Sequence, residues 1–258
     1  MARIGLDIRK INDFGIGTYI RHLVEGFARD AGGHEFVLLV PEGEEIEDLP
    51  DSMEQAIEPS GLYSIREPFS LGSATHRLKL DLLHCPHYVT PFRPACPVAV
   101  TIHDIIHLLF QQHLPNVFAR MYATFFMRRA AKKSAVVFTV SESSKRDILK
   151  HLPAKKDRII VTPNGVDPIY FESFPENETT AVLKKHDLQR PYVLYVGNNK
   201  PHKNLPRALE AFRLFRKGAP EWRFALAGGS FADPTSGAAL LNMVEEKKLA
   251  DAIVFLGF

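Results

Sequence analysis

Short apolar runs, each rich in Val, Ile or Leu, recur through the first two thirds of the chain. Their length and composition predict buried β-strands at residues 3–8, 35–40, 82–85, 98–102, 135–140 and 159–161. Between several of these runs, apolar residues recur every three or four positions, which is the spacing of a helix with one buried face. Residues 41–79 show neither pattern clearly, and no element is assigned to them.

The helical pattern is clearest after the first strand, where one apolar face is formed by Ile20, Leu23, Val24 and Phe27. A long helix is predicted over residues 115–133, with Pro115 near its first turn. A shorter helix is predicted from residue 141 to 152, where Ser141 or Ser143 can cap the N-terminus.

The alternation restarts after residue 190. Strands are predicted at 192–196, 223–227 and 252–256, with helices at 204–217 and 236–247 between them and Asn204 as the N-cap of the first. Residues 172–190 are polar and lack a strand pattern, which indicates a linker. Strands that alternate with helices form parallel sheets. We therefore expect two α/β domains, at residues 1–175 and 191–258, joined by a linker at 176–190.

The composition limits the classes of function that the chain can have. An apolar share of 45% and a charged share of 24% suit a globular protein with a sizeable core. The net charge of +2 argues against a nucleic-acid partner. Cys85 and Cys96 are expected to be reduced. The sequence shows no signal-peptide pattern and no membrane-spanning apolar run, so a cytoplasmic location is expected.

Two glycine loops are candidates for phosphate binding. The strand at 192–196 ends at Gly197, and Lys203 stands just before the next helix. A helix N-terminus carries unpaired N–H groups and partial positive charge, to which the lysine adds a full charge. The alternative for this loop is a glycine turn with a solvated lysine. Gly15-Ile16-Gly17 repeats the arrangement before the first helix, but Ile20 departs from G-x-G-x-x-G, so the dinucleotide-binding signal is weak.

These loops belong to an ordered set of motifs: GIGTYIRHL, VTIHDIIHL, FTVSESSKRDI, VTPNGVD, LYVGNNKPHKNLPRALEAF and FALAGG. In this order the chain resembles the GT-B glycosyltransferases of the GT4 class. Within that class, the chain most resembles enzymes that transfer mannose or a related sugar from a nucleotide donor during glycan or lipopolysaccharide assembly. The resemblance runs from residue 3 to residue 258. It implies two Rossmann-like domains with parallel sheets: an acceptor-side domain, then a nucleotide-sugar-binding domain that is incomplete here.

The resemblance also implies roles for individual residues. Gly15 and Gly17 would approach the donor phosphate and the acceptor. His103 would contact the transferred sugar near its hydroxymethyl group. Lys203, with Gly197 and Asn198, would bind the diphosphate.

Other candidate residues carry open alternatives. The family often has arginine after the strand glycine, where this chain has Asn198, and whether His202 or Lys200 compensates for the missing charge stays open. Asp104 either orients His103 or caps the following turn. Three residues are candidates for contacts with donor or acceptor: Ser141, Asn164 and His202.

Glycosyl transfer requires that the leaving diphosphate be stabilised. No aspartate pair with metal-binding spacing follows a predicted strand, so the reaction is expected to need no metal or other cofactor. The resemblance implies retention of anomeric configuration and a glycan or lipid-linked acceptor. Family members carry an E-x7-E glutamate pair, whereas no two glutamates here are eight positions apart. The chain is therefore expected to be the N-terminal portion of such an enzyme, with little activity alone.

Other interpretations stay open. The same scaffold could be a catalytically silent nucleotide-binding module. His103 and His107 have the i, i+4 spacing of zinc ligands and would suit a zinc hydrolase, but the glutamate of H-E-x-x-H is missing. The aromatic and basic helix at 115–133 could give weak peripheral association with the inner face of a membrane. The favoured interpretation is a core-facing stripe with solvated charges, the stripe being Phe118, Tyr122, Phe125 and Phe126.

Overall fold

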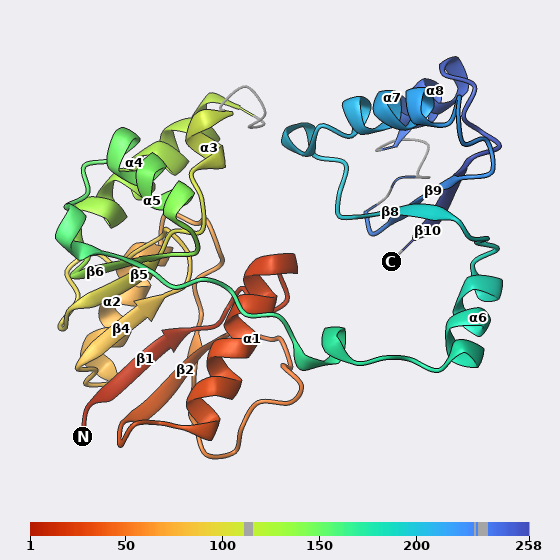
Figure 1. The fold of residues 1–258 in the computed structure, drawn as a ribbon. Helices are drawn as coiled ribbons and strands as arrows, with labels where there is room; N and C mark the ends of the chain where they lie inside the picture. Colours follow the sequence, from red (N-terminus) through yellow and green to blue (C-terminus); the bar gives the residue numbers. More distant parts are fainter. Residues whose placement is uncertain (111–115, 230, 232–236, 258) are drawn as a thin grey trace. The chain divides into compact units, whose positions relative to one another are not determined.

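The computed structural model describes residues 1–110, 116–229, 231 and 237–257 of the chain. It divides into two compact units, Met1–Gly165 and Val166–Phe258, each built around its own parallel sheet (Figure 1). The α/β class predicted from the alternating pattern is confirmed in both units. The predicted placement of Pro115 lies outside the described residues.

The first unit contains a seven-stranded sheet with the order β3-β2-β1-β4-β5-β6-β7. Its strands are β1 (Arg3–Asp7), β2 (Glu35–Pro41), β3 (Glu54–Glu58), β4 (Leu82–Cys85), β5 (Val98–Thr101), β6 (Val136–Thr139) and β7 (Ile159–Val161). All neighbouring strands are parallel, with Gly5 of β1 opposite Val37 on one side and Leu83 on the other. The loops that follow the strands therefore meet at one edge of the sheet.

Helices cover this sheet and create two separate cores. They are α1 (Phe14–Arg29), α2 (Glu67–Arg77), α3 (Ile106–Leu109), α4 (Val117–Lys133) and α5 (Glu142–His151), with a 3-10 turn at Lys156–Arg158. Ile20 and Val24 of α1 pack with Leu38 of β2. Leu39, the next residue of β2, belongs to the other core, because successive side chains of a strand point to opposite faces.

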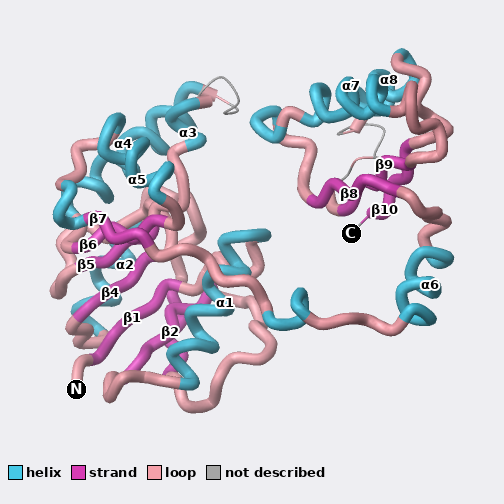
Figure 2. Tube along the Cα trace, viewed as in Figure 1, coloured by secondary structure: helices cyan, strands magenta, loops and turns pink. Residues whose placement is uncertain are grey.

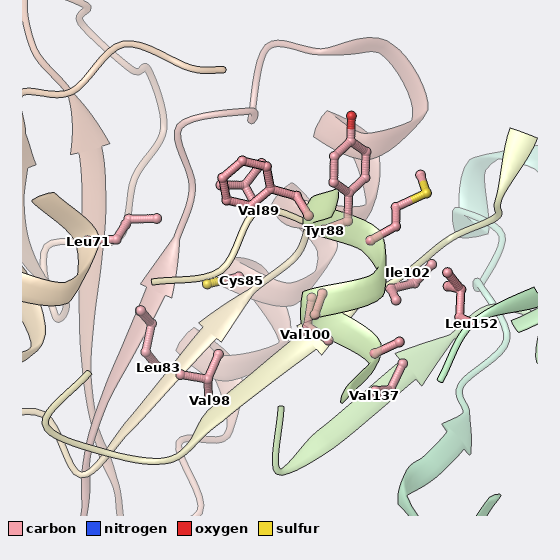
Figure 3. Close-up of a cluster of buried hydrophobic side chains, with 14 of the residues drawn as sticks. Leu71, Leu83, Cys85, Tyr88, Val89, Val98, Val100, Ile102, Val137 and Leu152 are labelled. Atoms are coloured by element: carbon pink, nitrogen blue, oxygen red, sulfur yellow. The ribbon is translucent and has the colours of Figure 1, made fainter. Parts of the chain in front are cut away.

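The second core is the larger one. Helices α2, α4 and α5 bring Leu71, Met127 and Ile148 against strand residues that include Leu83 and Val100. Figure 3 shows part of this cluster, in which the side chains from neighbouring strands gather under the helices. This packing holds the strand ends, and hence the loops after them, in fixed relative positions.

Residues 41–79 contain two elements that the hydrophobic pattern did not reveal. β3 is a short strand at the sheet edge with glutamate at both ends, which suits an edge position. α2 contains Pro68 and Gly72, both poor helix formers. Pro68 is tolerated in the first turn. A Cβ at Gly72 would lie 2.0 Å from the carbonyl oxygen of Phe92, so close packing on that loop requires glycine.

The second unit contains a three-stranded sheet with the order β10-β9-β8, both pairs parallel. Its elements are a 3-10 turn (Pro168–Phe171), α6 (Glu176–Lys185), β8 (Tyr192–Val196), a 3-10 turn (Pro201–Lys203), α7 (Leu205–Phe215), β9 (Arg223–Ala227), α8 (Ala238–Glu246) and β10 (Ile253–Gly257). Leu209, Leu226 and Leu240 join α7, β9 and α8 in one core. Helix α6 lies within the residues predicted to be a linker, has no buried side chain, and is flanked by loops (Figure 2).

The two predicted helix caps differ in outcome. Ser141 caps α5, because its Oγ accepts a hydrogen bond from the Ser144 amide at 3.0 Å, as predicted. Asn204 is the N-cap residue of α7, as predicted, although its side chain makes no capping hydrogen bond. Asn204 is instead in the left-handed conformation with φ 54°, which asparagine tolerates better than most residues.

Candidate functional site

The carboxyl edge of the seven-stranded sheet carries most of the predicted site residues. His103 and Asp104 follow β5, Ser141 follows β6, and Asn164 follows β7. A cavity of about 580 Å³ opens at this edge and continues along α1. Gly15 and Asn164 both line it, so the fold brings together two predicted site residues that are far apart in the sequence.

His103 is held by two contacts. Its Nε2–H donates to the carbonyl oxygen of Pro86 at 3.2 Å, and its ring lies edge-on to Tyr19 with the ring centroids 4.8 Å apart. Burial lowers the pKa of His103, and the Pro86 hydrogen bond and the Asp104 carboxylate oppose this. The ring is therefore neutral near pH 7. Because Nε2 carries the proton, Nδ1 can accept a hydrogen bond from a hydroxyl group.

Tyr19, whose ring contacts His103, is the first of three polar side chains that are connected to one another. The Tyr19 hydroxyl lies 3.1 Å from Oγ1 of Thr101, which in turn lies 2.8 Å from Nε2 of His84. Burial, with a smaller contribution from His103, lowers the pKa of His84 to about 4. No sequence motif predicted this chain, since Tyr19 and Thr101 are 82 positions apart and only the sheet order brings them together.

Asp104 and Ser141 act as local caps. Oδ1 of the exposed Asp104 accepts a hydrogen bond from the Ile106 amide at 2.9 Å, so of its two predicted roles the structure shows the cap. Asp104 influences His103 through its charge, which raises the pKa of the imidazole. The Ser141 hydroxyl is likewise used at the start of α5, where it also donates to Oγ of Ser144 at 3.1 Å.

The two glycines of the first loop have different surroundings. Helix α1 begins at Phe14, so both glycines lie in its first turn rather than before it, which corrects the prediction. A Cβ at Gly17 would lie 2.2 Å from the carbonyl oxygen of Ile11, so packing alone requires glycine there. No atom would lie within 4 Å of a Cβ at Gly15, which lines the cavity. Gly15 is therefore the one placed to approach a ligand.

In the second unit, glycine turns follow both β8 and β9. The Gly197 amide donates to the carbonyl oxygen of Ala227 at 3.0 Å, and a Cβ at Gly228 would lie 2.8 Å from the Gly197 oxygen. Gly228 and Gly229 have φ values of 85° and 65°, a region that favours glycine. These two residues end the FALAGG motif, but they were not predicted as site residues.

Lys203 is exposed and ends the 3-10 turn that precedes α7. Pro206 has no N–H, and the Arg207 amide donates to the carbonyl oxygen of Asn204 at 3.1 Å. The start of α7 therefore offers an anion the helix dipole and the Lys203 ammonium rather than a row of free amides.

Asn198 and His202 lie in the same loop as Lys203. Oδ1 of Asn198 accepts a hydrogen bond from the Lys200 amide at 3.2 Å, and the Asn198 carbonyl oxygen accepts one from the Tyr195 hydroxyl at 2.9 Å. Asn198 therefore shapes the turn. His202 is half-buried within the 3-10 turn.

Metal-ligating side chains are scattered. Within residues 1–110, 116–229, 231 and 237–257, no group of three or more His, Cys, Asp or Glu side chains could hold a metal ion. Cys85 and Cys96 are both free and buried, and burial raises the pKa of the Cys85 thiol well above its usual value. The described part of the chain thus offers no ligand set for the zinc interpretation. In that same part, no helix is long and apolar enough to cross a membrane.

Proteins of known structure share the fold of this chain. Sucrose-phosphate synthase from Thermosynechococcus elongatus has a TM-score of 0.68 at 18% identity, covering 100% of this chain and 70% of that one. Alr3699/HepE from Anabaena, solved in complex with UDP-glucose, has a TM-score of 0.70 at 13% identity, covering 100% and 69%. At these identities the likeness shows the fold alone. Two parallel α/β units of this kind define the GT-B fold of glycosyltransferases.

Sequence comparison identifies the family. The model of Glycosyltransferase Family 4 matches residues 15–169, and that of Glycosyl transferases group 1 matches residues 178–258. The first match covers more than half of the chain, which therefore belongs to Glycosyltransferase Family 4. O-antigen chain mannosyltransferase B of Escherichia coli is 28% identical over 153 residues, which span 59% of this chain and 39% of that protein.

Proposed function

We propose that the chain serves a retaining glycosyltransferase that moves mannose or a related hexose from a nucleoside-diphosphate donor to a glycan or lipid-linked acceptor. The observation that carries this proposal is the loop from Gly197 to Lys203 at the mouth of α7, inside a segment matched by a glycosyltransferase model. The mannosyltransferase relative favours mannose, and the UDP-glucose complex of a structural neighbour favours a nucleotide-sugar donor.

The second unit supplies positive charge that stabilises the leaving diphosphate. As the bond between the sugar C1 and the diphosphate oxygen breaks, negative charge grows on that oxygen. Lys203 supplies a full positive charge, and the α7 dipole supplies a partial one. The tight glycine turns at Gly197 and Gly228 lie against each other and leave backbone without side chains at the ends of β8 and β9. These groups give the diphosphate its positive partners without calling on a metal.

The first unit supplies the sugar and acceptor contacts. Nδ1 of the neutral His103 accepts a hydrogen bond from a hydroxyl of the transferred sugar, and the Tyr19–Thr101–His84 chain keeps the ring in place. Gly15 lets the acceptor approach the start of α1. The acceptor oxygen bonds to C1 on the face that the diphosphate leaves, and its proton passes to the departing phosphate oxygen. Asp104 holds the turn after His103.

A matched pair of lysine variants tests the diphosphate site. Lys203→Ala should weaken binding of a nucleoside diphosphate by at least about tenfold, since a hydrogen bond to a charged group is worth about 1.5–3 kcal/mol. Binding of the corresponding nucleoside should change little. Lys217→Ala removes an exposed lysine just beyond the other end of α7 and serves as the control. Competition titrations with UDP, GDP and their nucleosides measure both effects. Equal losses for diphosphate and nucleoside, or equal effects of the two variants, would contradict the assignment.

A further inference from the structure

Helix α4 has an apolar face that the core does not cover. Ala123, Phe126 and Met127 face the core and are buried. On the opposite face, Phe118 and Phe125 are 82% and 53% exposed. The expectation that these two phenylalanines belong to the core stripe was therefore wrong. The apolar spacing of α4 fits two faces, and the tertiary fold buries one of them.

The apolar face of α4 continues onto α2. Phe92 lies between the two helices, with its ring centroid 4.9 Å from that of Phe69 and 6.5 Å from that of Phe125. Phe69 and Met121 are 58% and 64% exposed. We call the set Phe69, Phe92, Phe118, Met121 and Phe125 the α2–α4 surface. Single exposed apolar residues are ordinary, but a contiguous group marks an interaction site.

Positive charge adjoins this surface. Phe118, Met121 and Phe125 are followed at helical spacing by Arg128 and Lys132, both exposed on the same line of α4. The Arg129 guanidinium carbon lies 4.6 Å from the centre of the Phe92 ring. Helix α4 contains no acidic residue, and its basic residues are Arg120, Arg128, Arg129, Lys132 and Lys133. Between residues 82 and 141 the sequence has a single acidic residue, Asp104. The charge is thus concentrated locally, although the whole chain carries only +2.

A hollow on the same helix adds a specific anion partner. It has a volume of about 480 Å³ and is lined by Val117, Arg120, Met121, Thr124 and Phe125. Nε of Arg120 is buried and has no hydrogen-bond partner within the described residues. Because Arg120 lines the hollow, a phosphate group seated there would pair with its guanidinium charge, while the apolar side chains beside it would contact hydrocarbon.

We propose that the α2–α4 surface docks on a bilayer that contains anionic lipid. Apolar side chains beside arginine and lysine fit the boundary between lipid headgroups and acyl chains. A second copy of the chain fits poorly, because it would oppose one basic helix with another. The proposal deepens the proposed function, since docking would bring the enzyme to a lipid-linked acceptor. Lipid binding itself needs no donor or acceptor, so its failure is distinguishable from failure of the transferase reaction.

Vesicle flotation of the 258-residue chain, without substrates, tests the proposal. The chain should float with vesicles of phosphatidylglycerol and phosphatidylcholine, and much less with phosphatidylcholine alone. Each basic residue near an anionic surface favours binding roughly fivefold, so Arg128→Glu/Lys132→Glu should reduce binding by well over tenfold. Phe118→Ser/Phe125→Ser should also reduce it at least tenfold. Added salt should weaken the binding of the wild type.

Matched variants on the second unit control for loss of charge and of aromatic surface. Lys184→Glu/Lys185→Glu reverses two exposed charges on α6, and Tyr170→Ser/Phe171→Ser removes two exposed aromatic rings. Both should leave flotation unchanged, and circular dichroism should show that all variants fold. Absence of binding to anionic vesicles, or equal losses in the control variants, would overturn the proposal. So would a concentration-dependent dimer in sedimentation equilibrium that Phe118→Ser/Phe125→Ser abolishes, because the surface would then bind a second copy.

Discussion

Removal of the Arg9 side chain should destabilise the first unit more than any surface substitution. The guanidinium is buried at the carboxyl end of β1, where its Nη2 lies 2.7 Å from the Asp7 carboxylate and 3.0 Å from the Glu67 carboxylate. Its Nη1 donates a hydrogen bond to the carbonyl oxygen of Ser60 at 3.0 Å. One side chain thus ties the end of β1 to the start of α2 and to the loop after β3. That corner of the sheet carries the loop that leads to Gly15.

The expected loss of unfolding free energy follows from the burial of the Arg9–Glu67 ion pair. Arg9→Met would leave Glu67, whose side chain is 3% exposed, as an unpaired buried carboxylate. Removing one partner of such a pair costs about 3–5 kcal/mol. Arg190 pairs with Glu176 at 3.1 Å where both side chains are largely exposed, so Arg190→Met should cost about 1 kcal/mol or less.

Acid should partly relieve the Arg9→Met defect. Burial raises the pKa of Glu67, and Arg9 opposes the rise. Without Arg9 the pKa should rise further. A carboxyl whose pKa is raised in the folded state loses stability as the pH increases through that pKa. The difference in unfolding free energy between wild type and Arg9→Met should therefore be larger at pH 7 than near pH 5.

Hydrogen exchange across a urea series can follow each unit by itself. Peptides from β1 and α2 should lose protection at lower urea in Arg9→Met. The fluorescence of Trp222, the single tryptophan, should report an unchanged second unit. Replacing the partner as well, in Arg9→Met/Glu67→Leu, should restore part of the loss, because no unpaired charge then remains at Glu67. Equal costs for Arg9→Met and Arg190→Met would refute the reasoning.

Two further outcomes are expected for the first unit. Gly17→Ala should lower the unfolding free energy by about 1–3 kcal/mol in urea titrations, since its Cβ would meet the Ile11 carbonyl oxygen, whereas Gly15→Ala should not destabilise the fold. His84, with a folded pKa of about 4, takes up its proton more readily in the unfolded chain. The first unit should therefore lose stability as the pH falls from about 6.5 towards 4, and His84→Gln should lose less over the same range.

Local hydrophobic patterns were sufficient to predict most of the fold. They were insufficient to predict how the side chains of the candidate site come together. Every strand except β3, together with helices α1, α4, α5, α7 and α8, was predicted, because each carries its own apolar run or helical spacing. Helix α2 was not, because Pro68 and Gly72 interrupt that period for reasons of packing against a distant loop. Sequence motifs predicted Gly15 and His103 as site residues, whereas the contact between Tyr19 and Thr101 depends on strand order. The exposed face of α4 likewise could not be told from the buried one by spacing alone.

The central claim is that the loop from Gly197 to Lys203, at the start of α7, binds the diphosphate of a sugar donor. A nuclear magnetic resonance titration of the labelled 258-residue chain with UDP and GDP tests it residue by residue, even if binding is weak. We predict amide shift changes confined to the loop from Gly197 to Lys203, the first residues of α7 and Gly228–Gly229, which the matching nucleosides do not reproduce. Shift changes that avoid these residues, or none at millimolar diphosphate, would contradict it.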